Sequence, residues 1–462
     1  MNDRQRVVVV GGGLAGLAAG VEAADRGAAV TLLERRPRLG GATWSFEHRG
    51  ISFDNGQHVF MRCCDAYRRF LERIGSADKV RLQSRLEVPV LRPGGPIGAI
   101  RRTAGPAPLH LLASLLTYPH LGRRRRLRVV RTAMALRRLD PEDPALDCMT
   151  FGDWLAARGT DTATVEALWN LIVLPTVNVP AAEASLKLAA MVFRTGLLSR
   201  ADAGDIGWAK VPLSVLHGDA ARRTLEAAGA DVTTGAAVRG VRPGPDGRPV
   251  VETDGRPIEA DAVVVAVPHA AAGPLLPAGA VASQERLEEL GVSPIVNVHL
   301  VYDRPVMELP MAAGVGSDVE FVFDHTEASG LDDGRQCLTV SLSAARSYIG
   351  RRSPDLVRHF EAEMARLLPA AGGARVTDSI VTRERAATFF GAPGTHELRP
   401  GARTALAGVF LAGAWCDTGW PATMEGAVRS GVEAARLATG FAAAARPSEP
   451  RADLPDAPAV AA

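Results

Sequence analysis

The chain has 462 residues, of which 47% are hydrophobic and 23% are charged, so it can build two or three domains of the usual size of roughly 100–200 residues. This composition excludes a largely disordered protein, and no run of about 20 uncharged apolar residues offers a membrane-spanning helix. Because 53 basic residues face 51 acidic ones, the net charge is only +2, which is too balanced for a chain that wraps nucleic acid along its whole length.

The five cysteines favour a reducing compartment, because their number is odd and none forms a C-x-x-C pair or a zinc-like spacing with histidine. We therefore expect a cytoplasmic protein without a metal site. The apolar run Val7–Val10 meets Gly11–Gly13 at once, so we interpret it as part of the fold and not as a signal peptide.

The first segment has the pattern of a dinucleotide-binding βαβ unit. A strand at Val7–Val10 is followed by a glycine turn, a helix at Leu17–Arg26 and a second strand at Ala29–Leu33 that ends in Glu34. In such a unit the glycines allow a tight turn and close approach of the pyrophosphate, the helix N-terminus faces the phosphates, and the acid binds the ribose hydroxyls. The candidate residues of the turn are Gly11, Gly13, Leu14, Ala15 and Gly16. The alternative is an ordinary glycine turn.

A second glycine pair, Gly40-Gly41, follows Glu34 after five residues, and a simple NAD domain does not require it. This arrangement resembles the FAD-binding superfamily of amine oxidases and phytoene desaturases. The resemblance implies that Arg35, Gly40, Gly41 and Ala42 also contribute to an FAD site, with Ala42 standing where family members commonly have Arg. Arg35 could in principle bind the 2′-phosphate of NADP, but Glu34 would repel that phosphate, so we expect FAD.

The next segment contains the run Asp54-Asn55-Gly56-Gln57-His58. This run resembles one bacterial branch of the superfamily, the hydroxysqualene dehydroxylases, and so do Leu174–Pro180, Val211–Ser214 and the run from Trp415 onward. The resemblance extends from residue 5 to residue 440. It implies a C30 isoprenoid substrate, whereas no motif identifies the electron donor.

Asp54 and His58 are the candidate catalytic residues, because removal of a hydroxyl group requires an acid. We expect His58 to be the proton donor or an orienting group, and Asp54 to be its partner or the acid itself. The alternative is that Asp54 holds the turn at Asn55-Gly56 while His58 is satisfied in the core.

Residues 101–140 carry ten arginines, whereas Asp140 is the only acid among them. Leu109–Leu116 is apolar, so one interpretation is a basic amphipathic surface that lies on an anionic membrane, peripheral to its inner face. A solvated arginine-rich helix is the second interpretation. Nucleic-acid binding is the third and the least favoured, since no aromatic residues are interleaved.

Later segments complete the expected cofactor site. Ala230–Val241 predicts strand, turn and strand, Asp261–Pro268 predicts a further strand, and Gly408–Gly413 predicts a strand leading to a helix that ends near Ala438. The resemblance implies that the backbone of one residue contacts the adenine and that the last helix points its N-terminus at the flavin. The residues implied are Val238, Gly413, Thr423, Met424 and Ala427.

One position departs from the family pattern. The residue after Gly413 is Ala414, where family members usually have an Asp that binds the cofactor. Loss of such a charge-assisted hydrogen bond costs about 1.5–3 kcal/mol. Either FAD binds less tightly here, or Asp417 takes over the role.

These patterns predict an α/β protein with a discontinuous Rossmann-like FAD domain, a mixed α+β substrate domain and a helical part that faces the membrane. The expected FAD domain comprises residues 1–75, 205–268 and 380–445, the substrate domain comprises 76–204 and 269–379, and 446–462 form a disordered tail. The expected activity is reductive removal of the hydroxyl of hydroxysqualene. The alternatives are a carotenoid-type desaturase, an amine oxidase and a non-catalytic isoprenoid carrier.

Overall fold

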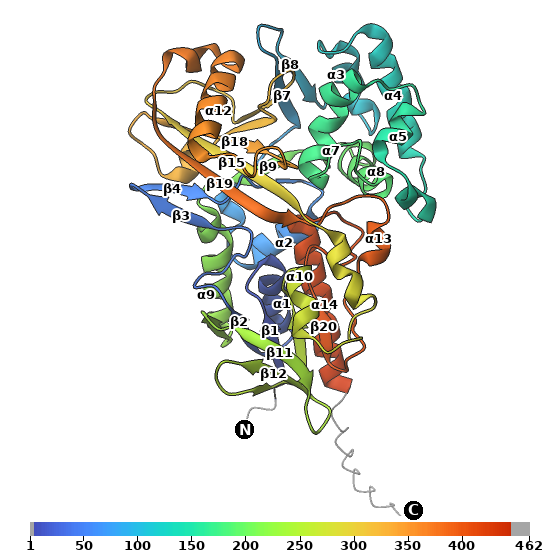
Figure 1. Cartoon of the computed structure of the whole chain (residues 1–462), viewed down its shortest axis with the longest axis vertical. Coiled ribbons are helices and arrows are strands. Elements are labelled where there is room, and N and C mark those ends of the chain that lie inside the picture. Colours follow the sequence, from blue (N-terminus) through green and yellow to red (C-terminus); the bar gives the residue numbers. More distant parts are fainter. Residues whose placement is uncertain (1–3, 445–462) are drawn as a thin grey trace, which may run out of the picture.

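A computed structural model describes residues 4–444, and the expected tail at 446–462 lies outside them. The lower part of the molecule in Figure 1 is built on a five-stranded parallel sheet. Its strands, in spatial order, are β10 (Asp231–Thr234), β2 (Ala29–Glu34), β1 (Arg6–Val10), β14 (Ala262–Val265) and β20 (Val409–Leu411). The central strands are nearly continuous runs of buried valine, which is typical of a parallel sheet covered on both faces. The predicted α/β fold class is confirmed.

Two helices from opposite ends of the chain pack together on this sheet. They are α1 (Leu14–Asp25) and α14 (Met424–Ala444), the blue and red helices of Figure 1. Their backbones approach closely at Gly431, where an added Cβ would lie only 2.1 Å from the carbonyl oxygen of Ala15. Both helices are longer than the pattern predicts, since α1 begins directly after Gly13 and α14 continues to Ala444.

The upper part contains a seven-stranded mixed sheet. Its strands, in spatial order, are β19 (Val376–Thr388), β15 (Ser293–Tyr302), β18 (Gln336–Leu342), β17 (Phe321–Asp324), β16 (Met311–Gly314), β7 (Glu87–Leu91) and β8 (Gly98–Arg101). Helix α12 (Ser353–Leu367) covers one face with the buried side chains of Leu356, Phe360 and Met364. The boundary expected at residue 380 falls inside β19, which pairs with β15 along its length.

Three smaller sheets complete the fold, of which β11–β13 lies at the lower end of the molecule in Figure 1. They are β11 (Val238–Pro243) with β12 (Pro249–Thr253) and β13 (Ile258–Glu259); β3 (Ser45–His48) with β4 (Ile51–Asp54); and β5 (Val59–Met61) with β9 (Ile206–Ala209) and β6 (Val80–Leu82). The pair β3 and β4 lies against the large sheet, because Ile51 and Phe53 share a buried cluster with Val301 and Cys337.

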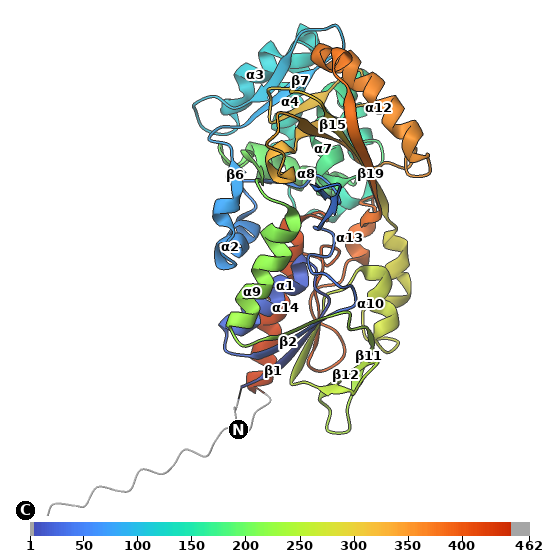
Figure 2. The ribbon, with the colours of Figure 1, turned by 90° about the vertical axis from the view of Figure 1, so that its left-hand side faces the viewer.

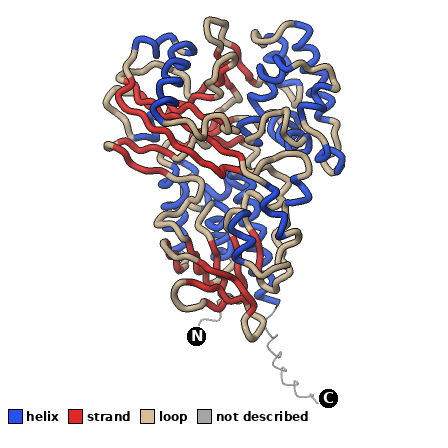
Figure 3. Tube along the Cα trace, in the orientation of Figure 1, coloured by secondary structure: helices blue, strands red, loops and turns tan. Residues whose placement is uncertain are grey.

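Most of the remaining helices gather beside the large sheet, apart from the strands, as Figure 3 shows. They are α3 (Leu112–Thr117), α4 (Arg123–Arg137), α5 (Phe151–Ala156), α7 (Asn170–Val177) and α8 (Leu186–Phe193). Phe151, Trp169 and Phe193 contact one another at the centre of this group, with ring centroids 5.2–5.7 Å apart. Among residues 4–444, no helix has the length and apolarity needed to cross a bilayer. The short helix α6 (Thr162–Thr164) also belongs to this group. Helices that lie elsewhere are α2 (Asp65–Arg73), α9 (Ala220–Ala227), α10 (His269–Leu275), α11 (Thr326–Ser329) and α13 (Thr395–Leu398).

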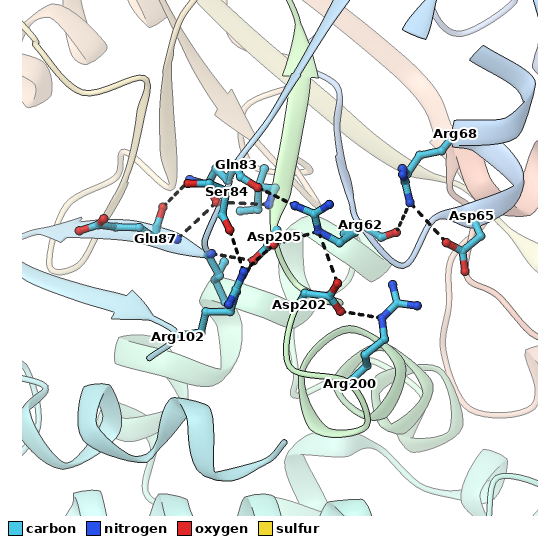
Figure 4. A network of polar contacts seen from close by, with 12 residues as sticks. Arg62, Asp65, Arg68, Gln83, Ser84, Glu87, Arg102, Arg200, Asp202 and Asp205 are labelled. Carbon is cyan, nitrogen blue, oxygen red and sulfur yellow. Dashed lines mark hydrogen bonds and ion pairs between the residues drawn. The ribbon is translucent and has the colours of Figure 1, made fainter. Parts of the chain in front are cut away.

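A buried carboxylate joins the helical part to the rest of the molecule (Figure 4). The side chain of Asp205 is fully buried and accepts hydrogen bonds from Arg62 Nε at 2.9 Å, Arg102 Nε at 2.6 Å and the Leu86 N–H at 2.7 Å. Burial alone would raise the pKa of Asp205, but the hydrogen bonds from Arg102 and Arg62 lower it below its usual value. Arg102, at the start of the arginine-rich segment, is therefore held in place.

Candidate active site

The predicted glycine turn connects β1 to α1. Gly11 has φ of +109°, and a Cβ at this position would lie 2.4 Å from the carbonyl oxygen of Ala266. A Cβ on Gly16 would lie 1.8 Å from the carbonyl oxygen of Gly11, so both positions exclude any larger residue. Leu14 and Ala15 lie in the first turn of α1. This turn contains no acidic residue, and no side chain caps it. Its N–H donors are therefore available to an anion.

Glu34 and the second glycine pair lie against this turn. The buried carboxylate of Glu34 accepts hydrogen bonds from the Gly12 N–H at 2.7 Å and the Arg36 N–H at 2.8 Å. Gly40 donates its N–H to the Gly12 carbonyl at 2.8 Å, and a Cβ on Gly41 would lie 2.7 Å from Gly13 Cα. Side chains at Gly40 and Gly41 would fill the space in which a pyrophosphate approaches the backbone. The two glycines therefore fit a bound dinucleotide.

The C-terminal candidates come to the same edge of the sheet. Gly413 follows β20 and donates its N–H to Ser430 Oγ at 2.9 Å. Thr423 caps α14 by accepting the Gly426 N–H at 3.1 Å, and Met424 and Ala427 lie half-buried in the first turn of this helix. Because α14 packs on α1 near Ala15, the chain's two distant halves meet at one site.

The adenine-side candidate is also adjacent. Val238 begins β11, directly after the turn in which the Ala236 N–H binds the Glu34 carbonyl at 2.9 Å. Arg35 and Ala42 are exposed near the same edge. Asp417 is exposed in the loop before α14, where its carboxylate accepts the Gly419 N–H at 3.1 Å, while Ala414 is half-buried.

Asp54 is held by three separate segments. Its Oδ1 accepts hydrogen bonds from Ser45 Oγ at 2.6 Å and from the Leu213 N–H at 3.0 Å. Its Oδ2 lies 3.6 Å from His325 Nε2, and both side chains are buried. No hydrogen bond joins Asp54 to His58 among the residues that the structure describes. These contacts favour the interpretation of Asp54 as a residue that holds its segment in place.

His58 lies half-buried in a turn that is tied to the second glycine pair. Asn55 donates Nδ2–H to the Ala42 carbonyl at 2.9 Å and accepts the Trp44 N–H at 3.0 Å. His58 Nδ1 lies 2.9 Å from the Gly56 carbonyl, which can only accept, so Nδ1 carries the proton and Nε2 is left without one. Burial lowers the pKa of His58, while the nearby Gly56 carbonyl and Asp54 oppose that shift.

Several residues that shape the site have no local signal in the sequence. Buried Arg399 binds the carbonyls of Trp415, Cys416 and Trp420 and so fixes the loop before α14. His325 approaches Asp54 from the end of β17. The run Val211–Ser214 does have a signal in the resemblance, and the structure explains it, since this run supplies the Leu213 N–H to Asp54.

Comparison with known proteins agrees with this geometry. Residues 14–439 match the family described as flavin containing amine oxidoreductase. The chain is 28% identical to the hydroxysqualene dehydroxylase of Rhodopseudomonas palustris over 444 residues, which cover 93% of this chain and 97% of that protein. It is 26% identical to the zeta-carotene desaturase of Zea mays, covering 92% and 82% of the two chains.

The solved structures that resemble this one include putrescine oxidase bound to putrescine. That structure has a TM-score of 0.71 and 20% identity, with 94% of this chain and 98% of that chain covered, which shows a shared fold. The family match spans nearly the whole chain, and the glycine segments at its two ends meet as a dinucleotide site requires. The chain therefore belongs to the flavin containing amine oxidoreductase family and is an FAD-dependent oxidoreductase.

Proposed function

We propose that this enzyme removes the hydroxyl group of hydroxysqualene reductively and so forms squalene. Two features support the proposal: the similarity along nearly the full length of bacterial hydroxysqualene dehydroxylases, and the nature of one group in the turn that Asn55 joins to Ala42. That group is His58, a half-buried imidazole with one free nitrogen, and this observation carries the proposal. The chain has only three lysines, Lys79, Lys187 and Lys210, which argues against an amine oxidase that uses a lysine beside the flavin.

The reaction needs a proton and a hydride. When bound and reduced, FAD supplies the hydride. The hydroxyl oxygen takes the proton and leaves as water, and the hydride occupies the vacated allylic carbon, so one reduced cofactor is consumed for each squalene formed. The protein must deliver the proton to the hydroxyl oxygen and exclude water from the carbon.

His58 Nε2 is the atom that we assign to proton delivery. Because burial lowers the pKa of His58, its protonated form is a stronger acid than an ordinary imidazolium and gives up its proton more readily. The bond from Nδ1 to the Gly56 carbonyl orients the ring, and Asp54 keeps the turn in position through Ser45 and Leu213. Asp54 is therefore a positioning residue in this proposal.

The test is to incubate the protein with hydroxysqualene and either reduced or oxidised FAD, and to analyse the products. Squalene formed only with reduced FAD supports the proposal. The second candidate is a desaturase, which the similarity to zeta-carotene desaturases favours. Products with additional double bonds, formed only with oxidised FAD, would establish that activity instead.

A further inference from the structure

Helix α3 buries a serine, while its leucines are only partly covered and one of them, Leu115, packs against the core. Its only fully buried residue is Ser114, whose hydroxyl accepts the Arg101 N–H at 3.1 Å and donates to the Ala99 carbonyl at 2.8 Å. Leu116 is 39% exposed, and Leu112 and Leu115 are half-exposed. A helix on the surface of a soluble protein normally has the reverse arrangement, with leucines inside and serines outside.

Other exposed apolar side chains gather at the same end of the molecule. Ile97 in the β7–β8 hairpin is 72% exposed, Leu109 before α3 is 59% exposed and Leu127 in α4 is 55% exposed. Together with Leu116 they make up half of the eight large exposed apolar residues in the described chain, although they fall within 31 residues of sequence. Figures 1 and 2 both show β7, β8, α3 and α4 at the end farthest from β11 and β12.

The arginines of this region fall into two groups. Four are tied to the protein: Arg102 binds Asp205, Arg125 binds Asp161, Arg126 binds the Leu116 and Leu121 carbonyls, and Arg128 binds the Gly159 carbonyl. The other six are exposed, and their guanidinium groups have no partner within residues 4–444: Arg101, Arg123, Arg124, Arg131, Arg137 and Arg138.

Helix α4 combines both features on one face. At 100° per residue, Arg124, Leu127, Arg131 and Arg138 lie within about 60° of one another around the helix axis. The buried residues Val129, Thr132 and Leu136 lie on the opposite face. Leu127 is thus flanked by Arg124 and Arg131, about one turn to either side, and no acidic residue occurs between Arg101 and Leu139 to neutralise them.

We propose that these six arginines and the side chains of Ile97, Leu109, Leu116 and Leu127, which we call the apical surface, dock the protein on an anionic lipid bilayer. The apolar side chains enter the interface while the arginines contact the headgroups. The inference goes beyond the proposed reaction, because docking requires neither substrate nor turnover.

The test is sedimentation of the FAD-loaded protein with vesicles of phosphatidylcholine alone, or of phosphatidylcholine mixed with phosphatidylglycerol. We expect binding to the mixed vesicles only, and we expect it to weaken as salt is raised. The variant Arg124→Ala/Arg131→Ala/Arg138→Ala should lower the partition coefficient about 100-fold, because each arginine at an anionic surface contributes roughly fivefold. The variant Ile97→Ser/Leu109→Ser/Leu116→Ser/Leu127→Ser should also lose binding.

The matched control is Arg223→Ala/Arg256→Ala, which removes two exposed arginines outside the apical surface and should bind as the parent does. Equal sedimentation with neutral and mixed vesicles, or equal binding by the arginine variant and the control, overturns the proposal. A change in oligomeric state of the serine variant without vesicles also overturns it, since the surface would then be a contact between copies. Turnover of detergent-dispersed hydroxysqualene by both variants separates a failure of docking from a failure of the proposed reaction.

Discussion

At the scale of single residues, the contacts of Asp205 carry a clear energetic consequence. Its carboxylate is fully buried between Arg62 and Arg102. We expect Asp205→Asn to lower the free energy of unfolding by about 1.5–3 kcal/mol, because asparagine offers one neutral oxygen to two guanidinium groups. Urea denaturation measures this change. The control Asp202→Asn alters a carboxylate that is 44% exposed and should cost about 1 kcal/mol or less. Equal losses in the two variants would contradict the argument.

The proposed role of His58 predicts how the rate depends on pH. Because burial lowers the pKa of His58, its protonated fraction falls about tenfold for each pH unit above neutrality. We therefore expect kcat for squalene formation to fall about tenfold per unit between pH 7 and pH 8. His58→Gln should lower kcat by about 10²–10⁴-fold and remove this dependence.

Asp54→Asn separates positioning from proton transfer. Asparagine keeps an oxygen that can accept from Ser45 and the Leu213 N–H, so we expect the pH profile to be retained. A profile that becomes flat in Asp54→Asn while remaining intact in His58→Gln would show that Asp54 is the acid.

The glycine turn of the site could be predicted from the sequence, whereas the contacts between residues distant in the sequence could not. Glycines and the acid at a strand end define a βαβ turn within some thirty residues, so Gly11, Gly16 and Glu34 could be predicted. The partners of Asp54 come from β3, from the Val211–Ser214 run and from β17, and no local pattern specifies such pairings. The ten arginines of residues 101–140 look alike in sequence, whereas only the fold separates those that are tied from those that are free.

At the scale of elements, the crossing of α1 and α14 sets a strict limit on side-chain size. A Cβ on Gly431 would lie 2.1 Å from the Ala15 carbonyl oxygen, and both partners are helix backbone that cannot move independently. We expect Gly431→Ala to lower the melting temperature and to reduce the FAD retained after gel filtration, because the residues predicted to bind FAD include those in the first turns of both helices.

The same helix provides a matched control. Gly440 is exposed, and nothing lies within 4 Å of a Cβ built at this position. Gly440→Ala should therefore stabilise the protein by about 0.5–1 kcal/mol, because alanine is the better helix former. If the two variants shift the melting temperature in the same direction, the close approach of the two helices is not what requires glycine at 431.

The elements themselves were predicted unevenly. Strands β1, β2, β14 and β20 are short valine-rich or apolar runs, and their parallel pairing follows from the dinucleotide-binding pattern. The order of the seven-stranded sheet could not be predicted, because β7 and β8 join strands that lie more than 200 residues later in the chain. Pairings of that range depend on the whole tertiary fold.

At the scale of the whole molecule, buried titratable groups predict a stability maximum near neutral pH. Burial lowers the pKa of His217 and of His299 to about 3. Below pH 6.5 the unfolded chain therefore binds protons that the folded protein does not, and stability decreases as the pH is lowered. Burial raises the pKa of Glu320 to about 8, so between about pH 4.5 and pH 8 the folded protein holds a proton that the unfolded chain has lost. Burial also lowers the pKa of His58, His110, His120 and His269, so the histidines outweigh the glutamate in acid, and stability rises up to about neutral pH and then declines.

Urea midpoints measured from pH 5 to pH 8.5 check this expectation. Glu320→Gln should remove most of the decline between pH 6.5 and pH 8, because glutamine is neutral at every pH. Below pH 6, the urea midpoint of this variant should decrease more steeply with falling pH than that of the parent protein, because no glutamate opposes the histidines. A midpoint that rises steadily up to pH 8.5 in the parent protein would contradict the assignment of Glu320 as a protonated group.

The packing of α14 on α1 also bears on how the chain is made. Helix α1 leaves the ribosome long before its partner α14, which begins at Met424, so the face of α1 that packs on α14 stays uncovered during most of the synthesis between them. The cofactor site is completed by the same late element, which means that a nascent chain cannot be rescued by capturing FAD early. Premature termination between β14 and β20 yields a chain with an open sheet edge beside β14 and an uncovered helix, the kind of species that aggregates. We therefore expect chains truncated between these two strands to be recovered in the insoluble fraction.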